Sequence, residues 1–126
     1  MPILIVDDSA VMVRLLEYTL RSVGYATQAA LSGDAALERI REQRPALVFL
    51  DIMMPDVDGL QVLRRIRRDP ALAELPVVVI SARAQEADRD AALAAGATDY
   101  MTKPYSRDQV LAFAARYGGK PGVSTP

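Results

Sequence analysis

The stretch Ile3-Leu4-Ile5-Val6-Asp7-Asp8-Ser9 places four consecutive apolar residues directly before two carboxylates. A short, uninterrupted apolar run is typical of a strand covered on both faces, as strands of a parallel sheet are. We therefore predict a buried strand at 3–6, with Asp7 and Asp8 at its carboxyl end.

Three further apolar runs are each followed at once by a polar residue. They are 46–50 before Asp51, 77–80 before Ser81 and, more weakly, 98–102 before Lys103. Because the carboxyl ends of parallel strands share one edge of the sheet, we expect these residues to converge with the Asp7-Asp8 pair. Three carboxylates, a hydroxyl and an ammonium group would then form a chemical site.

Helical patterns alternate with these strands. The predicted helices are 9–23, 33–43, 60–68, 85–95 and 106–117, and a weak strand at 25–30 follows the first of them. Gly24 stands where a C-terminal cap belongs, and Ser106 and Gln109 have the spacing of a capping box. Alternating strands and helices predict an α/β fold, with a parallel sheet between helices and right-handed crossovers.

Composition limits the class of protein. A chain of 126 residues forms one domain, which we place at 1–117, and the Gly-, Pro-, Ser- and Thr-rich residues 118–126 suggest a flexible tail or the start of a linker. The net charge of −1 gives no general attraction to nucleic acid or membranes, and the chain has neither cysteine nor histidine chemistry. With no spanning segment or signal peptide, we expect a cytoplasmic protein.

The carboxylates at the sheet edge suggest a metal site. Like charges in one crevice repel each other, and Mg²⁺ is the hard cation that prefers such oxygen ligands. Asp7 or Asp8 alone could equally cap the helix that follows, and Lys103 alone could form a plain salt bridge. Taken together, these side chains suit a phosphoryl group arriving on Asp51, where Lys103 supplies a cation and Ser81 a hydroxyl donor.

The chain resembles the receiver domains of two-component response regulators over residues 2 to about 117. The resemblance is carried by Ile3-Leu4-Ile5-Val6-Asp7-Asp8-Ser9, by Leu50-Asp51-Ile52-Met53-Met54-Pro55-Asp56-Val57-Asp58-Gly59, by Val79-Ile80-Ser81-Ala82, and by Gly96-Ala97-Thr98-Asp99-Tyr100-Met101-Thr102-Lys103-Pro104. It implies a flavodoxin-like, doubly wound sheet of five strands in the order 2-1-3-4-5, with five helices.

The resemblance also implies roles for single residues. Asp51 would accept a phosphoryl group from a histidine kinase or a histidine phosphotransfer protein, assisted by Lys103. Asp8 and Asp51 would bind Mg²⁺ directly, Asp7 directly or through water, and Met53 through its backbone carbonyl. Such a domain is not an enzyme, although it catalyses its own phosphorylation and dephosphorylation.

The resemblance further implies a switch. Ser81 would bond the attached phosphoryl group, and Tyr100 would turn inward behind it and change a surface that downstream proteins recognise. The Lys103-Pro104 peptide bond would be cis.

The first helix suggests a docking surface for the phosphodonor. We predict an inward stripe made by Met12, Leu15, Leu16, Thr19 and Val23. The outward residues are then Ala10, Val13, Arg14 and Glu17, with Tyr105 and Ser106 on the adjoining loop. In the resembling family, the donor is met by this helix and this loop.

Other interpretations remain open. Arg64, Arg65, Arg67 and Arg68 fit a solvated helix face better than a nucleic-acid surface. The chain could also be the N-terminal receiver of a longer regulator with a DNA-binding or catalytic output domain. An aspartyl phosphohydrolase of the haloacid dehalogenase type would place its nucleophile after the first strand, in an Asp-x-Asp pattern that this chain lacks. No glycine-rich phosphate loop follows any predicted strand.

Overall fold

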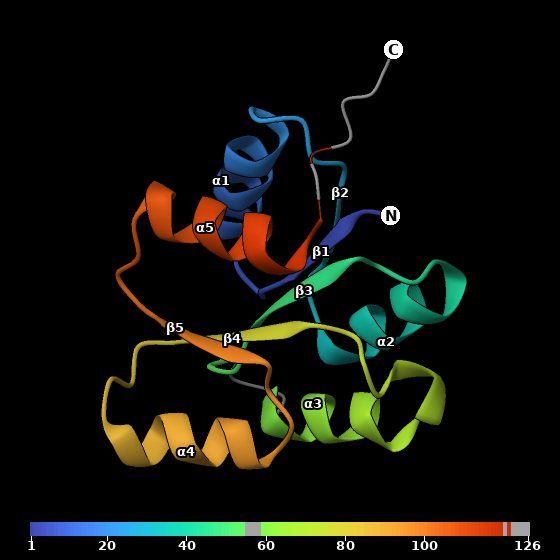
Figure 1. The fold of residues 1–126 in the computed structure, drawn as a ribbon, viewed down its shortest axis with the longest axis vertical. Coiled ribbons are helices and arrows are strands. Elements are labelled where there is room, and N and C mark those ends of the chain that lie inside the picture. The colour runs from blue at the N-terminus through green and yellow to red at the C-terminus, as the bar shows by residue number, and fades with distance from the viewer. Residues whose placement is uncertain (55–58, 120, 122–126) are drawn as a thin grey trace.

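The computed structural model describes residues 1–54, 59–119 and 121, and within them the chain forms one five-stranded parallel sheet (Figure 1). The strands are β1 Ile3–Val6, β2 Thr27–Ala30, β3 Leu47–Asp51, β4 Val77–Ser81 and β5 Asp99–Thr102. Their order is β2-β1-β3-β4-β5, so the predicted topology is confirmed.

The helices of the described residues cover both faces of the sheet. They are α1 Ala10–Arg21, α2 Gly33–Glu42, α3 Gly59–Arg68, α4 Glu86–Ala94 and α5 Arg107–Tyr117, with a short 3₁₀ turn at Pro70–Leu72. Figure 1 shows α1 and α5 together on one face and α2, α3 and α4 on the other. The side chains of Ser9 and Ser106 cap the N-termini of α1 and α5, and the predicted capping box is present at Ser106.

Two hydrophobic cores follow from this layering. The α1/α5-side core takes Ile3, Ile5 and Phe49 from the strands, and the α2–α4-side core takes Leu4 and Val6. The division reflects the alternation of side chains along each strand. The strand runs are apolar at every position because both faces are covered.

The predicted inward face of α1 is confirmed at Leu16 and wrong at Leu15 and Val13. Val13, Leu16 and Leu20 are the buried residues of this helix, whereas Leu15 is 56% exposed. Apolar residues occur on two sides of α1, so periodicity alone left its rotation undecided. The observed stripe at spacings of three and four residues faces α5 and the sheet.

The four arginines of α3, predicted to form a solvated face, are not all exposed. Arg67 is partly buried, and its guanidinium donates to the carbonyls of Gly96 and Leu72, each at 2.8 Å, and to the Thr98 hydroxyl at 3.3 Å. Arg64, Arg65 and Arg68 are exposed, as predicted. Arg67 therefore braces the loop between α4 and β5 against α3.

The residues just after α5 are held in place. The Tyr25 hydroxyl donates to the Gly119 carbonyl at 2.9 Å, and Gly118 is buried. Gly118 and Gly119 thus contact the folded domain, and residues 120 and 122–126 lie outside the described part of the chain, so the tail stays a prediction. In the described ranges, no helix is long and apolar enough to cross a bilayer.

Candidate functional site

Asp51 is the buried centre of the site. It is the last residue of β3, and its side chain is only 4% exposed. The Lys103 ammonium lies 2.7 Å from its Oδ2, and the backbone N–H of Met53 donates to its Oδ1 at 2.7 Å. The predicted approach of Lys103 to Asp51 is confirmed, and the Lys103-Pro104 peptide bond is cis. Each carboxyl oxygen of Asp51 thus accepts a hydrogen bond from one donor.

Asp7 lies beside Asp51 and is also buried. Burial raises the pKa of Asp7 from 3.8 to about 6, and the Asp51 carboxylate acts in the same direction, while a hydrogen bond from the Ser9 N–H opposes it. Two neighbouring carboxylates with one ammonium paired to Asp51 leave an excess of negative charge. The crevice is therefore suited to a further cation.

Asp8 occupies a different environment from its neighbour. Its side chain is exposed, and Ser9 rather than Asp8 caps α1. Among the residues that the structure describes, no three acidic or histidine side chains form a metal-binding group. Of the three carboxylates expected to converge, Asp7 and Asp51 are buried side by side, and Asp8 is exposed at the same end of β1.

Ser81 ends β4 on the opposite side of the sheet from Asp51. Asp51 shares its face with Phe49 of the α1/α5-side core, and Ser81 shares its face with Val79 of the α2–α4-side core. The Ser81 hydroxyl accepts a hydrogen bond from the Arg83 N–H at 3.1 Å. The buried Tyr100 donates from its hydroxyl to the Arg83 carbonyl at 2.7 Å. One residue therefore links Ser81 to Tyr100, a connection that strand patterns could not reveal.

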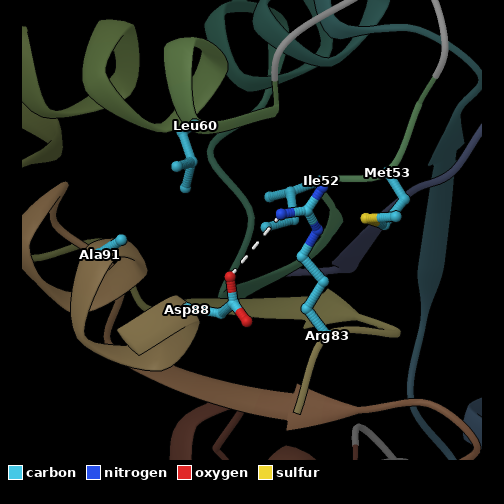
Figure 2. Close-up of a pocket in the computed structure, with 6 residues that line it drawn as sticks. All are labelled: Ile52, Met53, Leu60, Arg83, Asp88 and Ala91. Carbon is cyan, nitrogen blue, oxygen red and sulfur yellow. Dashed lines mark ion pairs between the residues drawn. The ribbon is translucent and has the colours of Figure 1, made fainter. Parts of the chain in front are cut away.

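A pocket of about 250 Å³ opens beside these residues. It is lined by Ile52, Met53, Leu60, Arg83, Asp88 and Ala91. Figure 2 shows the Arg83 guanidinium reaching across the pocket beside Ile52 toward Asp88, with which it forms an ion pair of 3.8 Å. The side chain of Arg83 is 66% exposed. It can therefore swing away from the pocket at little energetic cost.

The predicted docking residues are only partly at the surface. Ala10, Arg14 and Ser106 are exposed, and Tyr105 is half-buried. Val13 is 4% exposed and belongs to the α1/α5-side core, so its assignment to the docking surface is wrong. Glu17 is largely covered, because its carboxylate accepts hydrogen bonds from Arg21 and Thr27. These corrections have the same cause as the wrong rotation of α1.

The exposed apolar residues of α1 were missed. Val11 is 66% exposed, Leu15 56% and Tyr18 73%, and their spacing puts them on one side of the helix. A pocket of about 400 Å³ adjoins them, lined by Arg14, Glu17, Tyr18, Arg21 and Ser22. This apolar stripe, which we call the α1 stripe, begins three residues after Asp8.

Sequence comparison identifies relatives with this arrangement. The family profile of the response regulator receiver domain matches residues 3–115. The chain is 38% identical over 110 residues to the phosphate regulon transcriptional regulatory protein PhoB of Rhizobium meliloti (strain 1021), a match covering 87% of this chain and 48% of the relative. It is equally similar to the alkaline phosphatase synthesis transcriptional regulatory protein PhoP of Bacillus subtilis (strain 168), at 38% identity over 87% of this chain and 45% of the relative. The chain thus spans about half the length of these curated relatives.

Structural comparison agrees with the sequence match. The crystal structure of the receiver domain of NtrX from Brucella abortus superposes with a TM-score of 0.83 at 36% identity, covering 91% of this chain and 96% of that chain. The likeness extends over nearly the whole of both molecules.

Proposed function

The chain belongs to the response regulator receiver family, and on this premise we propose that Asp51 is the acceptor of a phosphoryl group donated by a phosphohistidine of a partner protein. Family membership places the chain among signalling domains of two-component systems and argues against the phosphohydrolase alternative. Histidine kinases or histidine phosphotransfer proteins are the donors proposed here. Attachment of the phosphoryl group would change the surface offered to a downstream protein or output domain.

The observation that carries this proposal is the pairing of Asp51 with Lys103. A carboxylate oxygen of Asp51 would attack phosphorus as the bond from phosphorus to the donor nitrogen breaks and its electron pair returns to the imidazole. Each carboxylate oxygen keeps a second lone pair after binding Lys103 or the Met53 N–H. Lys103 would then offset negative charge on the transferring oxygens, which is most of what phosphoryl transfer requires. On this view the domain catalyses its own phosphorylation and dephosphorylation.

We also propose that Mg²⁺ binds beside Asp51. Mg²⁺ typically takes one or two carboxylates together with water and phosphate oxygens, so the buried Asp7 and Asp51 pair fits it without a third buried acid. Burial, and after it the Asp51 carboxylate, raise the pKa of Asp7, and a divalent cation bound beside both groups would favour their charged forms instead. The proposed ligands are Asp8 and Asp51 directly, Asp7 directly or through water, and the Met53 carbonyl. When bound, the ion would supply positive charge to the phosphoryl oxygens.

The phosphodonor would dock on the α1 stripe. Val11, Leu15 and Tyr18 are the apolar side chains that α1 exposes near the acidic crevice, with Arg14 between them. An amphipathic helix carrying the donor histidine would bury this stripe and bring its imidazole to Asp51. Tyr105 and Ser106, between β5 and α5, remain part of the proposed docking surface.

Intact-mass measurement with acetyl phosphate tests the proposed function. Wild type should gain about 80 Da, roughly one phosphoryl group, in the presence of Mg²⁺ and should gain nothing in EDTA. Asp51→Asn keeps the size and the hydrogen bond from Met53 but is a poor nucleophile, so it should stay unlabelled. Equal labelling of both proteins would contradict the assignment of Asp51.

Titration with Mg²⁺ alone tests the ligands. Asp8→Ala should weaken binding at least tenfold, because it removes a formal negative charge from a hard-cation site. Ser81→Ala is the matched control, since it removes a hydroxyl that would meet only the phosphoryl group. Equal Mg²⁺ affinity in Asp8→Ala and wild type would contradict Asp8 as a ligand.

The length comparison favours a second candidate role. PhoB and PhoP are named as transcriptional regulatory proteins, and the chain spans about half of each. The chain could therefore act as the receiver of a longer regulator with a DNA-binding or catalytic output domain. Sequencing the gene beyond the codon for Pro126 decides between this role and a stand-alone one, because a stop codon there would exclude an output domain that follows.

A further inference from the structure

Tyr105 stands at the edge of the acidic crevice. It is the second residue after Lys103, in the loop between β5 and α5, and its side chain is half-buried against the α1/α5-side core. Asp51 faces the same side of the sheet, as the neighbouring Phe49 shows. Figure 1 shows the loop after β5 leaving the same edge of the sheet as the loop after β4. The phenol is thus on the side where a phosphoryl group would arrive.

The Tyr105 hydroxyl differs from those of the other buried and half-buried tyrosines in its hydrogen bonding. Burial raises the pKa of Tyr105 to about 12, and the charges of Asp7 and Asp51 add to the effect. Like an ordinary tyrosine, Tyr105 keeps its O–H donor at physiological pH. Within the described part of the chain, it has no hydrogen-bond partner. The hydroxyls of Tyr25, Tyr100 and Tyr117 each donate to a protein oxygen.

A neutral donor beside two carboxylates has a clear chemical use. We propose that the Tyr105 hydroxyl donates a hydrogen bond to a phosphoryl oxygen while the group passes to Asp51. The inference rests on the proposed function and adds a residue to it. With acetyl phosphate, the bond from phosphorus to the acetate oxygen breaks as the bond from phosphorus to an Asp51 oxygen forms, and acetate leaves with the electron pair. Tyr105 would supply a donor on the α1/α5 side without adding charge, in addition to the charge of the Lys103 ammonium.

The test compares Tyr105→Phe with wild type in labelling by acetyl phosphate and Mg²⁺, measured over a range of donor concentrations. The variant keeps the packed ring and loses only the hydroxyl. Its maximal labelling rate should fall about fivefold, the worth of one hydrogen bond of roughly 1 kcal/mol. The half-saturating donor concentration should change less than twofold. Tyr25→Phe is the matched control, because it removes a hydroxyl that binds the Gly119 carbonyl; it should label at the wild-type rate.

A spectroscopic measurement separates contact with the phosphoryl group from a structural role. Fluoroberyllate with Mg²⁺ mimics the attached group, and a hydrogen bond from Tyr105 should shift the ¹⁹F signal of one fluorine. That signal should move in Tyr105→Phe and stay in place in Tyr25→Phe.

Several outcomes would overturn the inference while leaving the proposed function intact. An unchanged labelling rate and ¹⁹F spectrum would show that the hydroxyl does not reach the group. A loss of Mg²⁺ affinity equal to the loss in rate would show that it serves the metal ligands instead. Slower transfer from a kinase alone, with normal acetyl phosphate labelling, would assign Tyr105 to docking. Absence of labelling in the wild type would overturn the proposed function and this inference with it.

Discussion

The hydroxyl of Tyr100 donates a 2.7 Å hydrogen bond to the carbonyl of Arg83, whose own N–H donates to the Ser81 hydroxyl at 3.1 Å. The backbone of one residue therefore joins the end of β4 to an aromatic ring of β5. If Ser81 turns its hydroxyl toward a phosphoryl group, the Arg83 N–H loses its acceptor and the carbonyl that holds Tyr100 is free to move. This gives the predicted switch residues a physical connection.

Tyr100→Phe should lower the free energy of unfolding by about 1 kcal/mol, because it leaves a partly buried carbonyl without its donor. Labelling of Asp51 by acetyl phosphate should stay within twofold of wild type. Urea unfolding gives the first quantity and intact mass the second. The control is to repeat Tyr100→Phe in a protein that carries Arg83→Ala. Because Tyr100 bonds the backbone carbonyl of residue 83, the loss of unfolding free energy should be the same in that protein. A cost that vanishes in Arg83→Ala would mean that the side chain, not the carbonyl, holds Tyr100.

Asp7→Asn should stabilise the metal-free protein above pH 6. The pKa of Asp7 is raised from 3.8 to about 6 in the folded state, so folding favours its protonated form. The contribution of Asp7 to the free energy of unfolding is therefore fully present below about pH 4 and is lost as the pH rises to 6. Asparagine stays neutral and keeps an oxygen acceptor for the Ser9 N–H. In EDTA, the free energy of unfolding of Asp7→Asn should exceed that of wild type by about 2 kcal/mol at pH 7, and the difference should approach zero at pH 4.

Urea unfolding in EDTA between pH 4 and pH 8 measures this gain. Addition of Mg²⁺ is the control, since the ion should stabilise wild type more than Asp7→Asn and so narrow or reverse the difference. A gain that is the same at pH 4 and pH 7 would show that ionisation of Asp7 is not its cause.

Leu15→Ala and Val13→Ala should have opposite consequences. Leu15 is exposed, so its truncation should change the free energy of unfolding by less than about 1 kcal/mol but slow transfer from the cognate kinase at least tenfold. Val13 is buried, so its truncation should cost about 2 kcal/mol of stability. Acetyl phosphate labelling should be normal in Leu15→Ala. Unimpaired kinase transfer in Leu15→Ala would place the docking surface elsewhere.

Arg67→Ala should cost about 2 kcal/mol or more, since it removes the donor of three hydrogen bonds to Gly96, Leu72 and Thr98. Gly96→Ala should also destabilise, because Gly96 has a φ of +113° and a Cβ there would lie 2.6 Å from Cγ of Arg67. Thermal unfolding of both single variants and of the double variant measures the coupling. The double variant should be more stable than the sum of the single effects predicts, because the clash is then gone. Strict additivity would contradict contact between the two residues.

The sequence predicted the sheet and the position of Asp51 for a local reason. Each strand is a short apolar run, and each functional side chain follows its strand directly, so the parallel topology alone brings Lys103 to Asp51. Asp8 shows the limit of that reasoning: alternation at the end of β1 leaves it exposed while Asp7 is buried.

Other features depend on contacts that no local pattern encodes. Leu15 and Val13 are both apolar and lie on different sides of α1, so only packing against α5 decides which one is buried. Arg67 looks like its exposed neighbours in sequence, because its partners are backbone carbonyls from two later segments. That the Tyr105 hydroxyl lacks a hydrogen-bond partner among the described residues likewise follows only from the structure around it.

The alternation that turns Asp51 toward α1 and Ser81 toward α3 and α4 has a consequence for how such a domain can be re-engineered. On the proposed function, the residues that would meet the donor lie on the α1/α5 side of the sheet, whereas Ser81 and Tyr100 lie on the α2–α4 side. Substitutions on α1 would then alter the choice of donor while leaving the packing around Tyr100 unchanged. Donor choice and response could be changed separately in such a domain.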